Sequence, residues 1–153
     1  MLRKSRAAAF RMAIRLLSDT RSTRGVPSKN RRFSRSLKNA LRGLLFIFIN
    51  ERNFRIECGF ALLAILAGIL LGISSIEWAI ISTNIFFVLA LEAKNTAIEM
   101  ITNIAAKEYD YGAKAAKDSS SGAVLLASTS SLFTSLFIFG PRIFSYVQGI
   151  VSK

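Results

Sequence analysis

The sequence predicts an all-α integral membrane protein, with three spanning helices and an amphipathic surface helix before them. The chain has 153 residues, of which 52% are hydrophobic, yet its formal net charge is +12. The apolar residues gather in runs of bilayer length, and the basic residues gather in the flanks. A basic nucleic-acid-binding domain would share the charge but not the long apolar runs. We therefore expect a membrane protein and no nucleic-acid partner.

The N-terminal region is strongly basic. Residues 1–42 contain thirteen of the twenty-one Lys and Arg residues and one acid, Asp19. Residues 1–17 have the pattern of a short basic amphipathic helix, and residues 18–30 that of a linker. Residues 1–32 thus read as a basic extension. It is either an arm held on anionic lipid or an organellar transit peptide, and we favour the arm in a bacterial cell.

A second amphipathic stretch covers residues 33–50. Arg35, Lys38 and Arg42 recur at helical spacing, and residues 44–49 are all apolar. This asymmetry favours a helix in the membrane interface over a spanning one. A cytosolic helix packed on protein is the alternative.

Residues 33–153 form the predicted membrane-embedded domain. Three apolar stretches in it match the thickness of the hydrocarbon core, and Gly140-Pro141 is expected to break or kink the third. Lys and Arg are abundant at the N-terminus and in the connection at 102–121. The positive-inside rule therefore predicts a cytoplasmic N-terminus and an external C-terminus in the cell inner membrane. The predicted spans are about 58–76, 78–100 and 122–140.

The second span carries polar residues on one face. Glu92, Asn95 and Glu99 are spaced i, i+3 and i+7, and they fall within about 60° of a helical wheel at 100° per residue. Lys94 points away from this face. Ionisable groups in a span are costly and mark function by default. They could equally serve as polar contacts between helices, and the residues alone leave both readings open.

Further carboxylates are expected at the same membrane level. Clustered carboxylates repel one another unless a cation neutralises them, and Mg²⁺ with a bound polyphosphate fits such a group. A structural zinc site is not expected, because the chain has no His and one Cys, Cys58. The chain has no Walker A loop or kinase-type Gly-rich loop. The five carboxylates are those of Glu51, Glu57, Glu92, Glu99 and Asp118.

Four sequence motifs resemble those of the prokaryotic diacylglycerol kinase and undecaprenol kinase family. Residues 92–99, EAKNTAIE, resemble the E-x-x-N-[ST]-A-I-E signature, and the AKD at 116–118 followed by GAVL at 122–125 resembles the second signature. The LRGL at 41–44 and the NERNFR at 50–55 resemble the surface helix and the start of the first span. The resemblance covers about residues 33–140, in the same order and spacing.

The resemblance implies a homotrimeric lipid kinase with active sites shared between subunits. Such an enzyme transfers a phosphoryl group from ATP, with Mg²⁺, to a membrane lipid hydroxyl. Glu92 matches the general base and Asn95 a second catalytic-site residue. Glu51 and Glu99 match the metal-binding and nucleotide-site glutamates. Lys117 and Asp118 match the nucleotide-contacting pair.

Three positions depart from the family pattern. Asp110-Tyr111 stands where many members have a His, Asn103 where many have an Asp, and Lys94 where the residue is usually apolar. None removes an indispensable residue, so an active enzyme is expected rather than a dead relative. The sequence at 51–53 favours undecaprenol over diacylglycerol as the acceptor. The competing hypothesis is a non-catalytic membrane module that binds anionic lipid through its basic arm.

Overall fold

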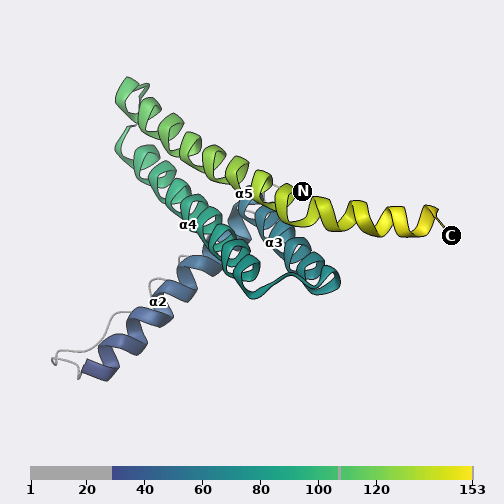
Figure 1. Cartoon of the computed structure of the whole chain (residues 1–153). Helices are drawn as coiled ribbons and strands as arrows, with labels where there is room; N and C mark the ends of the chain where they lie inside the picture. The colour runs from purple at the N-terminus through teal and green to yellow at the C-terminus, as the bar shows by residue number, and fades with distance from the viewer. Residues whose placement is uncertain (1–28, 107, 153) are drawn as a thin grey trace, which may run out of the picture. The chain divides into compact units, whose positions relative to one another are not determined.

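A computed structural model describes residues 29–106 and 108–152. The described residues form helices without strands, which confirms the predicted all-α class (Figure 1). The predicted helix at 1–17 lies outside the described residues. The chain divides into two units, the first ending at Arg52 and the second beginning at Asn53. The helices are α2 (Lys29–Asn50), α3 (Arg52–Leu71), α4 (Ser75–Ala105) and α5 (Tyr111–Val151).

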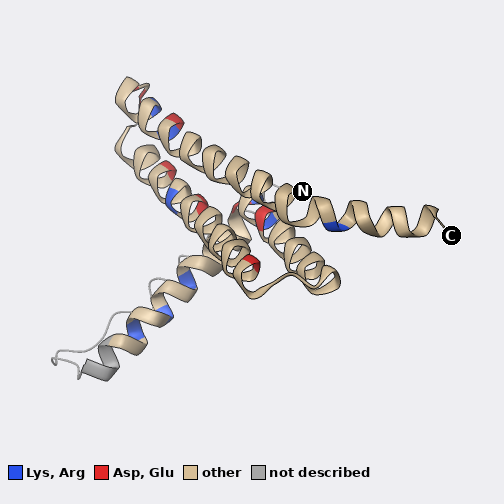
Figure 2. Ribbon diagram, viewed as in Figure 1, with Lys and Arg blue, Asp and Glu red and all other residues tan. Residues whose placement is uncertain are grey.

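The first unit contributes α2. This helix has Lys and Arg as its only charged residues (Figure 2), and large apolar side chains such as Leu41, Leu44 and Phe48 are exposed. It begins at Lys29, so the last two residues of the predicted linker are helical. The helix has the amphipathic pattern expected of an interfacial segment. That it lies on a membrane surface stays a prediction.

The second unit contains three helices long and apolar enough to cross a membrane, as predicted. The helix bounds differ from the predicted spans. The first helix begins at Arg52 rather than near residue 58 and ends at Leu71 rather than near 76. The difference arises because apolar runs mark the segment inside hydrocarbon, whereas the backbone helix continues into the polar flank. The charged residues at 52–57 thus belong to the first turns of α3.

A tight turn joins α3 to α4. Gly72 has a φ of +59°, a left-handed conformation that glycine adopts without the steric cost of a Cβ. Ser74 then caps α4: its hydroxyl accepts from the Glu77 N–H at 3.4 Å, and the Ser74 N–H donates to the Glu77 carboxylate at 2.7 Å. This capping box satisfies backbone donors at the helix start. The chain therefore turns back immediately, as the sequence predicts.

The polar connection predicted at 102–121 is mostly helical. Helix α4 continues to Ala105 and α5 starts at Tyr111. Asp110 is the N-cap of α5, and its Oδ1 accepts from the Ala113 N–H at 2.7 Å. A short break with a capping carboxylate is enough to reverse the chain. Helices α4 and α5 then run side by side in opposite directions (Figure 1).

Helix α5 continues through Pro141 to Val151. The ribbon changes direction near its yellow end (Figure 1), so the predicted kink is present but the predicted break is not. Proline has no backbone N–H, so one carbonyl in the preceding turn of the helix loses its hydrogen-bond donor. Neighbouring groups can donate to the backbone carbonyls near such a bend instead. Near the bend, the Arg142 guanidinium donates to the Ile138 carbonyl at 2.8 Å. Ser145 Oγ donates to the Pro141 carbonyl at 3.0 Å.

The apolar core of the second unit lies near the α3–α4 turn. Ile73, Ile81, Ile138 and Phe139 form its buried cluster, and Trp78 packs against it. Most other large apolar residues of the three helices are exposed. An exposed apolar surface of this extent is expected where lipid replaces water as the solvent. The core thus joins the three helices at one end of the unit.

Gly68 provides a test of this packing. A Cβ at Gly68 would lie 2.8 Å from Trp78 Cη2 and 3.0 Å from Ile73 Cδ1. We expect Gly68→Ala to lower the free energy of unfolding by about 1–3 kcal/mol, because it overpacks the core. Thermal unfolding of the purified protein in detergent measures the change. Gly59→Ala is the matched control, since nothing lies within 4 Å of a Cβ there. Equal stability of the two variants would contradict this packing.

Candidate functional site

The predicted polar face of α4 changes from buried to exposed along the helix. Glu92 and Thr96 are each only 3% exposed, although they are polar. Asn95 is half-buried, whereas Glu99 is exposed. Burying a carboxylate is costly unless it interacts with other groups, and Glu92 does make an interaction. The structure therefore places the three predicted residues on one helix, and Glu92 is the most buried of the three.

Hydrogen bonds join this face to α5. Ser121 Oγ donates to Asn95 Oδ1 at 3.4 Å, and Lys117 Nζ donates to Asn103 Oδ1. The amide of Asn103 thus accepts a hydrogen bond from the lysine, as an aspartate would. The first bond joins Asn95 of the 92–99 signature to the residue just before the GAVL at 122–125, and the second joins Lys117 of the AKD to a residue four positions after the first signature. They hold the polar ends of α4 and α5 in one register.

Lys117 does not lie beside Glu92. Its ammonium bonds to Asn103, which is eleven residues along α4 from Glu92. At 1.5 Å per residue the two positions are about 16 Å apart along the helix axis. The hypothesis that Lys117 lies close to the clustered carboxylates therefore does not hold for Glu92.

Asp118 and Asp110 occupy different environments near the start of α5. Asp118 is exposed on the turn after Lys117. Asp110 accepts the capping bond from the Ala113 N–H. From the sequence, Asp110 was expected only as a departure from a family motif, and its capping role was not predicted. An aspartate just before a helical pattern was the signal that could have identified it.

Glu57 from α3 is the second carboxylate near Glu92. Its Oε2 is buried and has no hydrogen-bond partner within residues 29–106 and 108–152. The carboxylates of Glu57 and Glu92 interact electrostatically, and like charges repel. A buried acceptor without a donor is uncommon in a protein. This end of the unit can therefore accept a hydrogen-bond donor or a cation from outside the chain.

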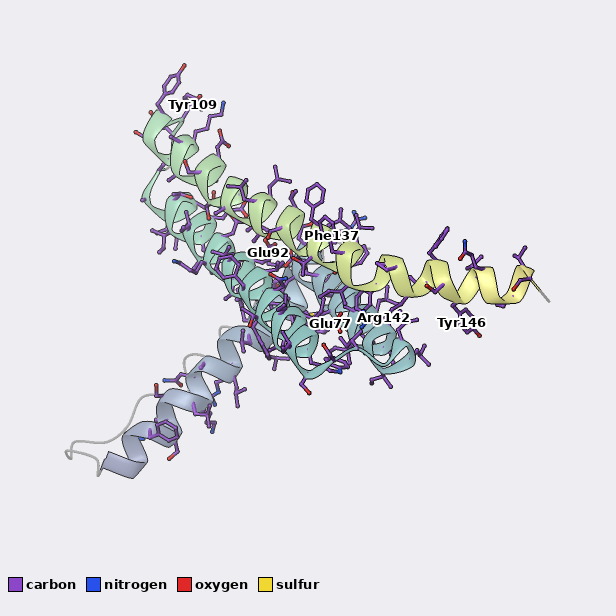
Figure 3. All side chains as sticks on the ribbon, viewed as in Figure 1. Glu77, Glu92, Tyr109, Phe137, Arg142 and Tyr146 are labelled. Atoms are coloured by element: carbon purple, nitrogen blue, oxygen red, sulfur yellow. The ribbon has the colours of Figure 1, made fainter. Side chains whose placement is uncertain are left out.

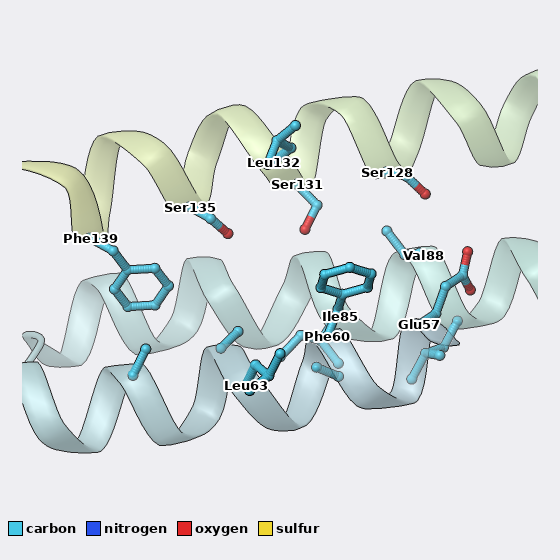
Figure 4. A pocket seen from close by; sticks show the side chains of 14 residues that line it. Glu57, Phe60, Leu63, Ile85, Val88, Ser128, Ser131, Leu132, Ser135 and Phe139 are labelled. Carbon is cyan, nitrogen blue, oxygen red and sulfur yellow. The ribbon is translucent and has the colours of Figure 1, made fainter. Parts of the chain in front are cut away.

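An apolar groove begins at Glu57 and continues between α3, α4 and α5 (Figure 4). Its volume is about 470 Å³. Ser128, Ser131 and Ser135 lie along one wall, and Phe139 closes the end away from Glu57. Apolar side chains such as Phe60, Leu63 and Val88 form most of the remaining wall. The groove has the shape and chemistry to hold a hydrocarbon chain with a polar group at the Glu57 end.

No metal site is preformed by the described residues. Within residues 29–106 and 108–152, no three His, Cys, Asp or Glu side chains lie close enough to hold an ion. Glu51 follows α2 and is half-buried in the first unit, and Glu99 is exposed in the second. Mg²⁺ is commonly held by one or two carboxylates together with substrate phosphates. An exposed carboxylate such as that of Glu99 offers oxygen donors of the kind that Mg²⁺ takes.

The match to known proteins covers most of the spanning region. The family model described as prokaryotic diacylglycerol kinase matches residues 38–139. The undecaprenol kinase of Bacillus subtilis (strain 168) is 37% identical over 112 residues, which cover 73% of this chain and 91% of the relative. The diacylglycerol kinase of Escherichia coli (strain K12) is 34% identical over 98 residues, covering 62% of this chain and 80% of the relative.

The matched segment contains α3, α4, the first part of α5 and the polar residues described above. Both the motifs and the three apolar helices agree with this match. The chain therefore belongs to the prokaryotic diacylglycerol kinase family, and it is a membrane lipid kinase with ATP as its phosphoryl donor.

Proposed function

We propose that the chain transfers the terminal phosphoryl group of ATP to the hydroxyl of undecaprenol or diacylglycerol at the cytoplasmic membrane surface. The observation that carries this proposal is the buried carboxylate of Glu92, which interacts electrostatically with Glu57 at the end of the apolar groove. The relatives named undecaprenol kinase and diacylglycerol kinase support both acceptors. The alternative of a non-catalytic membrane module is not favoured, because the family is one of kinases.

Glu92 acts as the general base. It accepts the proton of the lipid hydroxyl as the oxygen bonds to the phosphorus, and the bond to the leaving ADP breaks. Its burial excludes water from the proton-transfer step, which protects the phosphoryl group from hydrolysis. Asn95 lies one turn further along the same face, and Ser121 holds its amide. Asn95 therefore orients the reacting groups.

Mg²⁺ and the nucleotide bind toward the exposed end of the face. Glu99 and Glu51 would hold the metal, which when bound supplies positive charge against the phosphates of ATP. The exposure of Glu99 supports this role, because the carboxylate is open to a ligand. Lys117 and Asp118 contact the nucleotide. The distance of Lys117 from Glu92 favours a contact away from the reacting phosphoryl group.

The lipid chain occupies the groove. Its hydroxyl lies at the Glu57 end, where the buried Oε2 can accept a hydrogen bond. The serine hydroxyls along the wall do not distinguish a prenyl chain from an acyl chain. The groove therefore accepts the chemistry of either a prenyl or an acyl chain, and undecaprenol is preferred on the resemblance at 51–53.

The active enzyme is a homotrimer in the cell inner membrane with a cytoplasmic N-terminus. Sharing of sites between subunits is supported by the resemblance to the family and by the exposure of Glu99. The orientation is supported by charge, because residues 1–42 are strongly basic and the turn at 72–74 has no Lys or Arg.

The first prediction tests the function and its base together. Purified protein in mixed micelles with labelled ATP and Mg²⁺ should label undecaprenol or diacylglycerol when each is supplied separately. Glu92→Gln should lower the rate by at least about 100-fold, because the amide cannot take up the proton. Glu108→Gln, an exposed carboxylate outside the face, is the control. Labelling of neither lipid by a verified trimer would reject the kinase proposal.

The second prediction concerns the metal. Glu99→Gln should raise the Mg²⁺ concentration needed for half-maximal rate by about tenfold, equivalent to about 1.4 kcal/mol of binding free energy. The reason is the loss of one anionic oxygen donor at an exposed position. Titration of the rate with Mg²⁺ at saturating lipid measures the change. An unchanged titration curve with a lower maximal rate would assign Glu99 a different role.

The third prediction concerns the groove. Ala61→Phe should raise the KM for the lipid by about tenfold, because the ring occupies the space of the chain. The KM for ATP should not change. Ala90→Phe introduces the same ring at an exposed position outside the groove and should leave both constants unchanged. A parallel rise in the two KM values for Ala61→Phe would show general misfolding instead.

A further inference from the structure

Helix α5 is too long for all of it to lie within the hydrocarbon core, and its end after Pro141 extends past the predicted span. Helix α5 has 41 residues, or about 61 Å at 1.5 Å per residue, whereas the hydrocarbon core is about 30 Å thick. The predicted span from residue 122 to 140 already fills that thickness. The segment at 142–151 therefore lies beyond the hydrocarbon core. It also lies beyond residue 139, where the match to the family ends.

This C-terminal segment, residues 142–151, has one apolar face. Its six large apolar residues fall within about 160° of a helical wheel at 100° per residue. Its polar or small residues, such as Ser145 and Gln148, occupy the rest of the wheel. The apolar side chains are at least half exposed. They are Ile143, Phe144, Tyr146, Val147, Ile150 and Val151.

An ion pair fixes the start of the C-terminal segment. Both Arg142 guanidinium nitrogens, Nη1 and Nη2, donate to the Glu77 carboxylate at 2.8 Å (Figure 3). Glu77 belongs to the capping box of α4. The pair therefore ties the segment to the α3–α4 turn, and two charges near hydrocarbon neutralise each other. Arg142 and Glu77 are both only partly exposed.

We propose that residues 142–151 form an interfacial helix whose apolar face binds the membrane surface beside the α3–α4 turn. The bend at Pro141 turns the segment away from the direction of the preceding span (Figure 1). The segment continues directly from a membrane-spanning helix, so lipid is present where its apolar face emerges. Phe144 and Tyr146 are residue types suited to the headgroup region. A short helix with this asymmetry lies in the interface.

Spin labels test the proposal in the full chain reconstituted in phospholipid nanodiscs. Single cysteines at Phe144 and Val147 report on the apolar face, and those at Ser145 and Gln148 on the polar face, in a Cys58→Ala background. We expect labels on the apolar face to be more accessible to oxygen, and labels on the polar face to a water-soluble nickel complex. The apolar labels should lie about 5–10 Å below the surface.

Three results would overturn the proposal. Equal nickel accessibility on both faces would place the helix in water. A depth that increases steadily along the segment would mean that the helix continues across the bilayer. Protection of the apolar labels from both reagents would show that protein, such as a second copy of the chain, covers this face.

The ion pair is tested by Glu77→Gln. Glutamine preserves the capping box but removes the charge, so α4 should keep its start while the difference between the two faces is reduced. Arg142→Gln should have the same effect. Glu108→Gln, the same change in the α4–α5 connection, should leave the labelling pattern intact. An unaltered pattern in both Glu77→Gln and Arg142→Gln would reject the role of the pair in placing the segment.

Discussion

The register between α4 and α5 is the constraint on which the second unit depends. In apolar helices few side chains can fix a register, so each interhelical polar contact is significant. Such contacts lie at three well-separated levels of the described part of this pair. Glu77 bonds to Arg142 near the turn, Asn95 to Ser121 further along, and Asn103 to Lys117 near the connection. A shift of one residue would separate all three pairs. The pairing therefore determines which face of α4 is covered, and so determines that Glu92 is buried.

The same pairing separates two environments at opposite ends of the helices. Near the α3–α4 turn, the two charges neutralise each other and the apolar core packs beside them. Toward the connection, the predicted site residues change from the buried Glu92 through the half-buried Asn95 to the exposed Glu99. A kinase that uses a water-soluble nucleotide and a membrane lipid needs such a gradient, because the phosphate must be reached from water and the chain from lipid. The packed end near the α3–α4 turn thus holds α4 and α5 in position at the exposed end near the α4–α5 connection.

The sequence predicted the helical class, the three spans and the shared face of Glu92, Asn95 and Glu99, because both hydropathy and helical spacing are local properties. It did not predict the ends of the helices. The charged flank at 52–57 is helical, and α5 continues through Pro141, since helix formation does not stop where hydrocarbon stops. The Glu77–Arg142 pair joins residues 65 positions apart, and only tertiary packing could reveal it. The separation of Lys117 from Glu92 likewise follows from the register of two helices. The roles of the site residues stay predictions.

The unsatisfied oxygen of Glu57 gives a physical reason for the acceptor to be an alcohol. Within the described residues this buried oxygen lacks a donor, and the Glu92 carboxylate nearby cannot supply one while ionised. A lipid hydroxyl brings one proton and an apolar chain, and the groove starts at this position. An ester or ether oxygen has no proton to donate, so in either proposed acceptor only the free hydroxyl can satisfy this oxygen of Glu57. In the proposed mechanism the hydroxyl first donates its hydrogen bond to Glu57, and the same proton then passes to Glu92 as the phosphoryl group is transferred.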